Sequence, residues 1–389
     1  MTKRILFVDD ERQILRALKR LFIDSAYETV FMDNGEDALA YLEDNEVQLI
    51  ISDIRMPSMN GFDLLKKVKE KYPLTLRVAL SGYTDSKKIY KALEENIAKM
   101  YMFKPWDNKE LVNIIDQMME LEDVLKDKEL LDLINNINDL PTVPQLYLDI
   151  KRLIQEEADV EDIAKKIEED PPITSRILRV ANSAFYGAKT GSIAQAIMYI
   201  GLINVKNIVL SNGVFDAARS HNTNVKILWE HATVTNKITN LIYQDFMNKK
   251  IPNIFASAGL LHDIGKVIMF THYSETYDDL LREAVENKKT IVDLEKERYE
   301  VTHQELGGYL LNWWEIPLPI VETALYHHIP MDPRVINREL VSIVHLANYY
   351  SWLAVDHKEF LNQLDTTVFE FLQIDQEKLE SAIAKSLKG

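Results

Sequence analysis

The stretch Ile5-Leu-Phe-Val-Asp-Asp-Glu11 decides how the first part of the chain folds. An apolar run followed at once by acids predicts a buried strand that ends in a polar loop. Similar runs recur, with amphipathic stretches between them. The predicted strands are Ile5–Val8, Thr29–Phe31, Gln48–Ser52, Arg77–Leu80 and Met100–Phe103, and the predicted helices are Gln13–Phe22, Glu36–Leu42, Phe62–Tyr72 and Ser86–Glu94. This alternation predicts an α/β fold, a doubly wound five-stranded parallel sheet with helices on both faces.

Polar side chains stand where successive predicted strands end: Asp9 and Asp10, then Asp53, Ser81 and Lys104. The carboxyl ends of the strands form the ligand crevice of an open parallel sheet, so these side chains should meet. Three carboxylates in one crevice would repel unless a hard cation lies among them, and Mg²⁺ is the expected one. One carboxylate could then serve as the nucleophile in phosphoryl transfer.

Residues 1 to about 120 resemble a response-regulator receiver domain. The matching segments are Leu6-Phe-Val-Asp-Asp-Glu11, Ser52-Asp-Ile-Arg-Met-Pro57 with Gly61, Leu80-Ser-Gly82 and Tyr101-Met-Phe-Lys-Pro105. The resemblance implies phosphorylation by a cognate histidine kinase and assigns a role to each matching residue. These roles are phosphoacceptor for Asp53, Mg²⁺ ligands for Asp9, Asp10, Asp53 and the Arg55 backbone carbonyl, phosphoryl contacts for Lys104 and Ser81, and the switch for Tyr101.

A fifth helix is predicted after Asp107, and it continues beyond the length that a compact domain needs. One of its faces carries an apolar stripe with 3-4-3-4 spacing: Leu111, Ile114, Met118, Leu121 and Leu125. Such a stripe is either the seam of a homodimeric coiled coil or one packed face, and two heptads do not decide between them. The prolines of Asp139-Leu-Pro-Thr-Val-Pro144 end the helix. We therefore expect a receiver at 1–120, a linker helix at 121–139 and an all-α domain at 140–389.

Histidines dominate the chemistry of the all-α domain. The candidate metal ligands are His231, His262, Asp263, His303, His327 and His328. His262 and Asp263 fall in an apolar helical run, and imidazole with a bridging carboxylate suits Zn, Mn or Fe. Two such ions can activate water against a phosphoester. A single histidine on a helix is more often a core or surface residue, and His221, His272, His345 and His357 are given that interpretation.

Residues 231 to about 348 are similar to the HD superfamily of metal-dependent phosphohydrolases. The resemblance implies that the histidines and Asp263 hold metal and that Lys266 faces a substrate phosphate. It also shows two departures. Asn348 stands where a catalytic HD domain has Asp, and His327-His-Ile-Pro-Met-Asp-Pro333 lacks the Gly-Tyr-Pro of the cyclic-di-GMP hydrolases.

Residues 140 to about 210 resemble the HDOD family instead. The matching segments are Leu140-Pro-Thr-Val-Pro144, Asp170-Pro-Pro-Ile-Thr174, Val180-Ala-Asn-Ser-Ala-Phe-Tyr-Gly187 and Ser192-Ile-Ala-Gln-Ala-Ile197. HDOD domains are regarded as signalling modules derived from HD enzymes, without established hydrolase activity. The resemblance therefore implies an HD-like helical output domain that follows the receiver.

Composition narrows the functions. The 61 acids against 45 bases give a net charge of −16, which argues against binding to nucleic acid, and no helix-turn-helix signal supports a transcription factor. No apolar run reaches the length of a membrane span or a signal peptide, so we expect a cytoplasmic protein. The leading hypothesis is a response regulator whose HDOD domain acts through an unknown protein partner or a dimer rearrangement. The alternative is a receiver-gated phosphodiesterase or phosphohydrolase acting on a cyclic dinucleotide or nucleotide.

Overall fold

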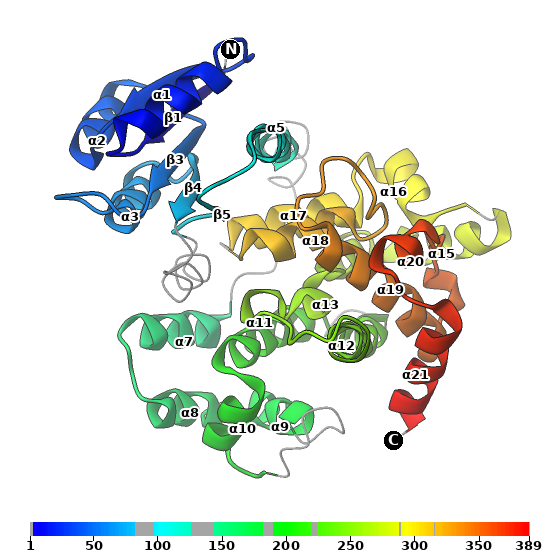
Figure 1. The fold of residues 1–389 in the computed structure, drawn as a ribbon. Coiled ribbons are helices and arrows are strands. Elements are labelled where there is room, and N and C mark those ends of the chain that lie inside the picture. The colour runs from blue at the N-terminus through cyan, green and yellow to red at the C-terminus, as the bar shows by residue number, and fades with distance from the viewer. Residues whose placement is uncertain are drawn as a thin grey trace. The chain divides into compact units, whose positions relative to one another are not determined.

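The computed structural model describes residues 3–81, 97–125, 144–181, 190–219, 224–287, 289–314 and 316–388 (Figure 1). Its contacts divide the chain into two compact units, residues 1–126 with 315–318 and residues 127–314 with 319–389. The strands and helices up to residue 125 are β1 (Arg4–Val8), α1 (Arg12–Leu21), β2 (Glu28–Met32), α2 (Gly35–Asp44), β3 (Leu49–Asp53), α3 (Gly61–Lys71), β4 (Leu76–Ser81), β5 (Met100–Phe103) and α5 (Asn108–Leu125).

The remaining described residues form helices and no strand. These helices are α7 (Gln145–Gln155), α8 (Val160–Glu168), α9 (Pro171–Ala181), α10 (Ile193–Ile200), α11 (Leu202–Arg219), α12 (Asn224–Leu241), η2 (Ile242–Phe246), η3 (Asn253–Phe255), α13 (Ala258–Leu261), α14 (Ile264–His272), α15 (Ser274–Asn287), α16 (Ile291–Tyr299), α17 (His303–Trp313), α18 (Leu318–Tyr326), α19 (Arg338–Ala354), η4 (Lys358–Phe360), α20 (Thr367–Leu372) and α21 (Gln376–Lys388).

The first unit is built on a parallel sheet with strand order β2-β1-β3-β4-β5. In β1 and β3 every apolar side chain from Ile5 to Val8 and from Leu49 to Ile51 is at most 1% exposed. Strands covered on both faces need such continuous apolar runs, which is why the sequence reveals them. The predicted fold class is confirmed, and every predicted strand overlaps an observed one. The predicted helix Ser86–Glu94 lies outside the described residues.

Helix starts in the first unit follow from their caps. The Asn34 side chain accepts a hydrogen bond from Asp37 N at 2.8 Å, and Asn60 accepts one from Asp63 N at 3.0 Å. These bonds satisfy backbone donors that have no partner within the first turn. They begin α2 and α3 directly after the loops that follow β2 and β3.

Helix α5 carries the apolar stripe that the sequence allows to be either a coiled-coil dimer seam or a face packed within the chain. Leu111, Met118 and Leu121 are at most 3% exposed within the single chain. Lys3 Nζ donates to Met119 O at 2.7 Å, and Tyr27 donates to Asp116 Oδ1 at 2.7 Å, so α5 is tied to the start of the first unit. The described helix ends at Leu125, and the rest of the predicted linker lies outside the described residues.

The second unit has its tightest helix crossings where the candidate site lies. Helix α12 packs along α19, and α14 packs against α17. A Cβ placed on Gly265 would lie 1.8 Å from the His303 carbonyl oxygen, so only glycine allows this approach. In the described part of the chain no single helix is long and apolar enough to cross a bilayer. The segments Ile193–Ile200 and Asn204–Ser211 pass that test only as a pair, across a bend of 109°.

Candidate functional site

The carboxyl edge of the sheet gathers three acids and a lysine. Asp9 follows β1 and Asp53 ends β3, the two strands at which the strand order reverses. Lys104 Nζ lies 2.7 Å from Asp9 Oδ2 and 3.1 Å from Asp53 Oδ1. One ligand oxygen each from Asp9, Asp10 and Asp53 lie within 4.8 Å of one another. The sequence prediction that these side chains meet therefore agrees with the geometry.

At this edge of the sheet three carboxylates lie near a single lysine, so negative charge exceeds positive charge. Burial raises the pKa of both Asp9 and Asp53, against the opposing effect of Lys104. Burial works to lower the pKa of Lys104, but its bonds to the two carboxylates raise it overall. Oxygen ligands without enough positive charge are the donor set that Mg²⁺ prefers, so these residues fit that ion.

The other predicted residues of this edge lie around it. The backbone at Gly61 packs directly against the end of β3. Only glycine fits there, because a Cβ would lie 2.0 Å from the Asp53 carbonyl oxygen. Arg55 lies exposed in the same loop. The half-buried ring of Tyr101 packs edge-on against Phe103, with centroids 5.0 Å apart. Ser81 ends β4, and its side chain lies outside what the structure describes.

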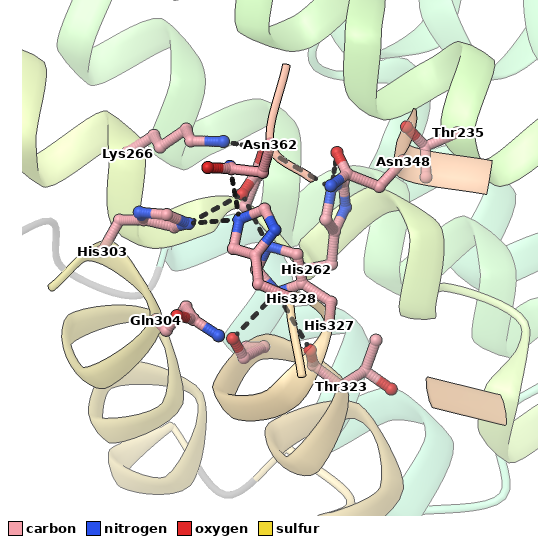
Figure 2. A network of polar contacts seen from close by, with 12 residues as sticks. Thr235, His262, Lys266, His303, Gln304, Thr323, His327, His328, Asn348 and Asn362 are labelled. Atoms are coloured by element: carbon pink, nitrogen blue, oxygen red, sulfur yellow. Dashed lines mark hydrogen bonds and ion pairs between the residues drawn. The ribbon is translucent and has the colours of Figure 1, made fainter. Parts of the chain in front are cut away.

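In the second unit, separate elements bring the six predicted ligands together, and Figure 2 labels four of them, His262, His303, His327 and His328. His231 comes from α12, His303 opens α17, and His327 and His328 follow α18. His262 and Asp263 differ from the expectation of one helical run, because they lie at the break between α13 and α14. Gly259 and Gly265, on either side of this break, allow close approach to the Asn236 backbone and to His303 O. The side chains of His262 and Asp263 are both buried.

Asp263 is the centre of the cluster. Its Oδ2 lies 3.4 Å from Nε2 of both His231 and His262, and its Oδ1 lies 3.5 Å from His303 Nε2 and 3.2 Å from His327 Nε2. His328 joins the second group, with its Nε2 3.1 Å from His303 Nε2. One carboxylate thus bridges two ligand groups, His231–His262 and His303–His327–His328.

Outer hydrogen bonds fix which ring nitrogen faces the centre. The Nδ1 atoms of His262 and His327 lie 2.9 Å from Gly259 O and 3.0 Å from Ala324 O, which can only accept. His303 Nδ1 lies 2.7 Å from Glu295 Oε2, a buried carboxylate that also accepts from Tyr277. Each Nδ1 therefore carries the hydrogen, and each Nε2 presents a bare lone pair.

His231 follows the same rule through a hydroxyl. Ser351 Oγ lies 2.7 Å from His231 Nδ1, and with its own hydrogen on Asn348 O at 2.9 Å it can accept a hydrogen bond from this nitrogen. Bare nitrogens around carboxylate oxygens repel one another unless a cation lies among them. The donor set, imidazole with a bridging carboxylate, fits two borderline divalent ions.

Burial sets the charge of this cluster. It lowers the pKa of His231 and His327 to about 3, so both imidazoles are neutral. Burial alone would raise the pKa of Asp263, but Lys266 and His262 hold it well below its usual range. Lys266 is fully buried and donates to Asp263 Oδ2 at 2.7 Å. In this position its ammonium neutralises the charge of Asp263 and does not face solvent. The resemblance instead implied that Lys266 faces a substrate phosphate.

Asn348 occupies the place that the resemblance assigned to an acid. Its Oδ1 lies 3.2 Å from His262 Nε2, at the His231–His262 group. His345, given a structural interpretation from the sequence, bonds to His327 O at 2.7 Å through Nδ1 and points away from Asp263. Sequence analysis missed Glu295, Ser351, Trp352 and Asn362, which only the tertiary fold brings to the cluster.

Comparison with known families agrees with both parts. Residues 5–116 match the response regulator receiver domain, and residues 140–330 match the HDOD domain. The chain carries a receiver domain followed by an HDOD domain. The receiver match ends within α5, and the HDOD match begins before α7 and ends shortly after His328.

Similar proteins cover one or both parts. An uncharacterised protein of Treponema pallidum is 26% identical over 259 residues, which are 66% of this chain and 50% of that protein. The receiver domain of an HD domain-containing protein from Pseudomonas fluorescens Pf-5 is 36% identical, with a TM-score of 0.31, over 31% of this chain and 98% of that one. An HDOD domain protein of unknown function from Geobacter sulfurreducens is 23% identical, with a TM-score of 0.48, over 68% and 99%. The chain spans half the length of the treponemal relative. Two hydrogenase transcriptional regulators match about a third of this chain, and the matched parts are 27% and 26% of their own lengths.

Proposed function

We propose that the protein is a phosphorelay response regulator in which phosphorylation of Asp53 controls the HDOD domain. The cognate partner would be a histidine kinase, and the site of action the cytoplasm. The observation that supports this is the contact of Lys104 with Asp9 and Asp53 at the strand-order reversal, beside Asp10. A carboxylate nucleophile, the Lys104 cation and oxygen ligands for Mg²⁺ are what phosphoryl transfer to a carboxylate needs.

The chemistry follows from these contacts. Asp53 forms a new P–O bond as the bond from phosphorus to the donor nitrogen of a phosphohistidine breaks. Lys104, held against both carboxylates, stabilises the charge on the phosphoryl group. Asp9 and Asp10, with the Arg55 carbonyl, would hold Mg²⁺, which supplies further charge neutralisation when bound. Ser81 and Tyr101 would then report the phosphoryl group to the rest of the receiver.

The test is acyl phosphate formation on the full chain. Incubation with Mg²⁺ and a small phosphodonor should raise the mass of the wild type by one phosphoryl group. Asp53→Ala should show no increase, and the exposed Asp24→Ala should behave as the wild type. Equal labelling of Asp53→Ala would reject Asp53 as the acceptor.

We further propose that the output is conformational and passes through protein contacts or a dimer rearrangement. Asn348 supports this, because a neutral amide is a weaker metal ligand than the expected carboxylate and offsets no cation charge. The phosphorylated form must then favour one arrangement in free energy. Small-angle scattering and sedimentation with and without phosphodonor should differ for the wild type and coincide for Asp53→Ala.

A second candidate function, a receiver-gated phosphohydrolase, is favoured by the inward Nε2 atoms around Asp263. His231, His262, His303, His327 and His328 would hold the metal with Asp263, and a bound ion would supply an activated water. Asp263 would bridge the two groups, and Lys266 would keep it charged. Turnover of cyclic and linear dinucleotides with Mn²⁺ or Fe²⁺, abolished in Asp263→Ala, would favour this function over the conformational one.

A further inference from the structure

A segment near the C-terminus covers the histidine cluster. Residues 361–365, between η4 and α20, form neither helix nor strand. We call residues 356–366 the strap. The HDOD match ends at residue 330, so the strap is not part of what the family comparison describes. His231, His262, Lys266, His303 and His327 are all 0% exposed, so a cation or a phosphoester reaches them only if part of the structure opens. His328, which the strap contacts, is half-buried.

Three of the contacts that hold the strap lie close to the cluster: one beside His231, one at His328 and one at His345. Phe360 stacks on Trp352 with centroids 4.5 Å apart, and Trp352 stacks on His231 at 3.5 Å. Asn362 Nδ2 lies 3.1 Å from His328 Nε2, a contact drawn in Figure 2. The third contact is from the strap backbone, where Asp365 N donates to His345 Nε2 at 2.9 Å.

The Asn362 contact conflicts with metal binding. A neutral imidazole nitrogen has one lone pair, which either accepts a hydrogen bond or ligates a cation. His328 Nε2 is the ligand atom of its group, and Asn362 Nδ2 lies 3.1 Å from it. The amide therefore occupies the direction from which this nitrogen would bind a cation. A cation can therefore take His328 Nε2 only after the amide has left.

We propose that the strap is a releasable cover of the cluster and that Asn362 is its latch, in direct competition with a divalent cation for His328 Nε2. The proposal rests on the metal-binding function of the cluster and adds what controls entry. Release would also uncover Lys266, whose ammonium could then leave Asp263 for an incoming anion. The strap is thus the element through which a partner or the receiver could regulate the site.

The experiment measures Co²⁺ binding to the full chain after chelator treatment. Asn362→Ala removes the amide that occupies His328 Nε2, so binding should tighten about fivefold, the worth of one hydrogen bond, and uptake should be faster. Gln363→Ala, at the neighbouring exposed position of the strap, is the matched control and should equal the wild type. The same titration of Asp263→Ala, which lacks the carboxylate shared by both ligand groups, gives the part bound by the receiver carboxylates, and this part is subtracted.

Each outcome has one meaning. Tighter and faster binding by Asn362→Ala alone supports the latch. Equal affinity and rate for Asn362→Ala and wild type overturn it and leave the metal site intact. A wild type that binds no more Co²⁺ than Asp263→Ala overturns the metal site itself, and with it the latch.

Discussion

Two regions of the molecule use the same contact in opposite surroundings. In the receiver, Lys104 lies 2.7 Å from Asp9, and in the HDOD domain Lys266 lies 2.7 Å from Asp263. The Lys104 side chain is 18% exposed and the Lys266 side chain 0%. Water can replace the first lysine as a partner of the acid, whereas nothing replaces the second. The receiver site is therefore suited to exchange ions with solvent. In the HDOD cluster, the buried Lys266–Asp263 ion pair is suited to stay intact.

The largest difference between the two domains is expected in the unfolding free energy lost when each lysine is removed. Lys266→Met leaves Asp263 charged and buried without its cation, at a cost of about 3–5 kcal/mol of unfolding free energy. Lys104→Met should cost the receiver about 1 kcal/mol, since Lys104 is itself 18% exposed and water can enter the space that it leaves. Urea titrations followed by hydrogen exchange and mass spectrometry assign each loss to its domain. Equal losses would contradict the contrast.

Acid should move the two domains in opposite directions. The pKa of His231 and His327 is about 3 in the folded state, so below pH 6.5 the unfolded chain binds more protons and the HDOD domain loses stability. At pH 5.5 the loss is about 1.4 kcal/mol for each histidine. The raised pKa of Asp9 and Asp53 has the other sign: the folded receiver holds the extra protons and gains stability on acidification.

The same urea and exchange measurement at pH 7.0 and 5.5 checks this. His327→Asn, which cannot titrate, should lose about 1 kcal/mol less stability on acidification than the wild type. The rest of the loss remains, because burial also lowers the pKa of His231, His328 and His345. A parallel shift of both domains would show that other groups dominate.

The outer carboxylate Glu295 should matter for metal and not for phosphorylation. Glu295→Ala removes the acceptor that fixes His303 Nδ1–H, and metal affinity should fall between about 10- and 100-fold. Glu295→Gln keeps an acceptor and should recover most of it. Glu297→Ala, an exposed ion-pair residue of the same helix, is the control. Calorimetric titration with Mn²⁺ measures the affinity, and loss in the Glu297 variant would point to general damage.

Asn348 offers the smallest change and the sharpest comparison with the receiver. Asn348→Asp adds a second carboxylate to the His231–His262 group, so the cluster becomes acid-rich as the receiver edge is. Metal should bind about tenfold tighter, equivalent to 1.4 kcal/mol. Without metal the variant should be less stable than the wild type, because two buried acids repel. An unchanged affinity would mean that this position does not contact the ion.

The sequence predicts one region far better than the other. Receiver strands are continuous apolar runs, and the residues that follow them meet because parallel strands end at one edge, so Asp9, Asp53 and Lys104 could be placed together. In the HDOD domain the sequence identifies the candidate ligands, but it does not predict how they are arranged in space. The break between His262 and Asp263 depends on Gly259 and Gly265 against other helices, which no local pattern contains.

The partners of the cluster were beyond sequence reasoning for the same reason. Glu295 lies in an ordinary charged helix, and Asn362 lies in a loop with no motif. Both acquire their roles through contacts with histidines 8 and 34 residues away in sequence. The resemblance to HD enzymes gave the ligands because they are motif residues. It gave no signal for residues that orient or cover them.

The stack of His231, Trp352 and Phe360 has an optical consequence. Trp352 is fully buried, so its indole should emit at short wavelength, and it lies in van der Waals contact with a candidate ligand ring. A paramagnetic ion on His231, or a proton on its ring, would quench that emission. Departure of Phe360 would instead admit water and shift the emission to the red. Against a Trp352→Phe baseline, intensity would therefore report what occupies the cluster, and wavelength whether the strap is open.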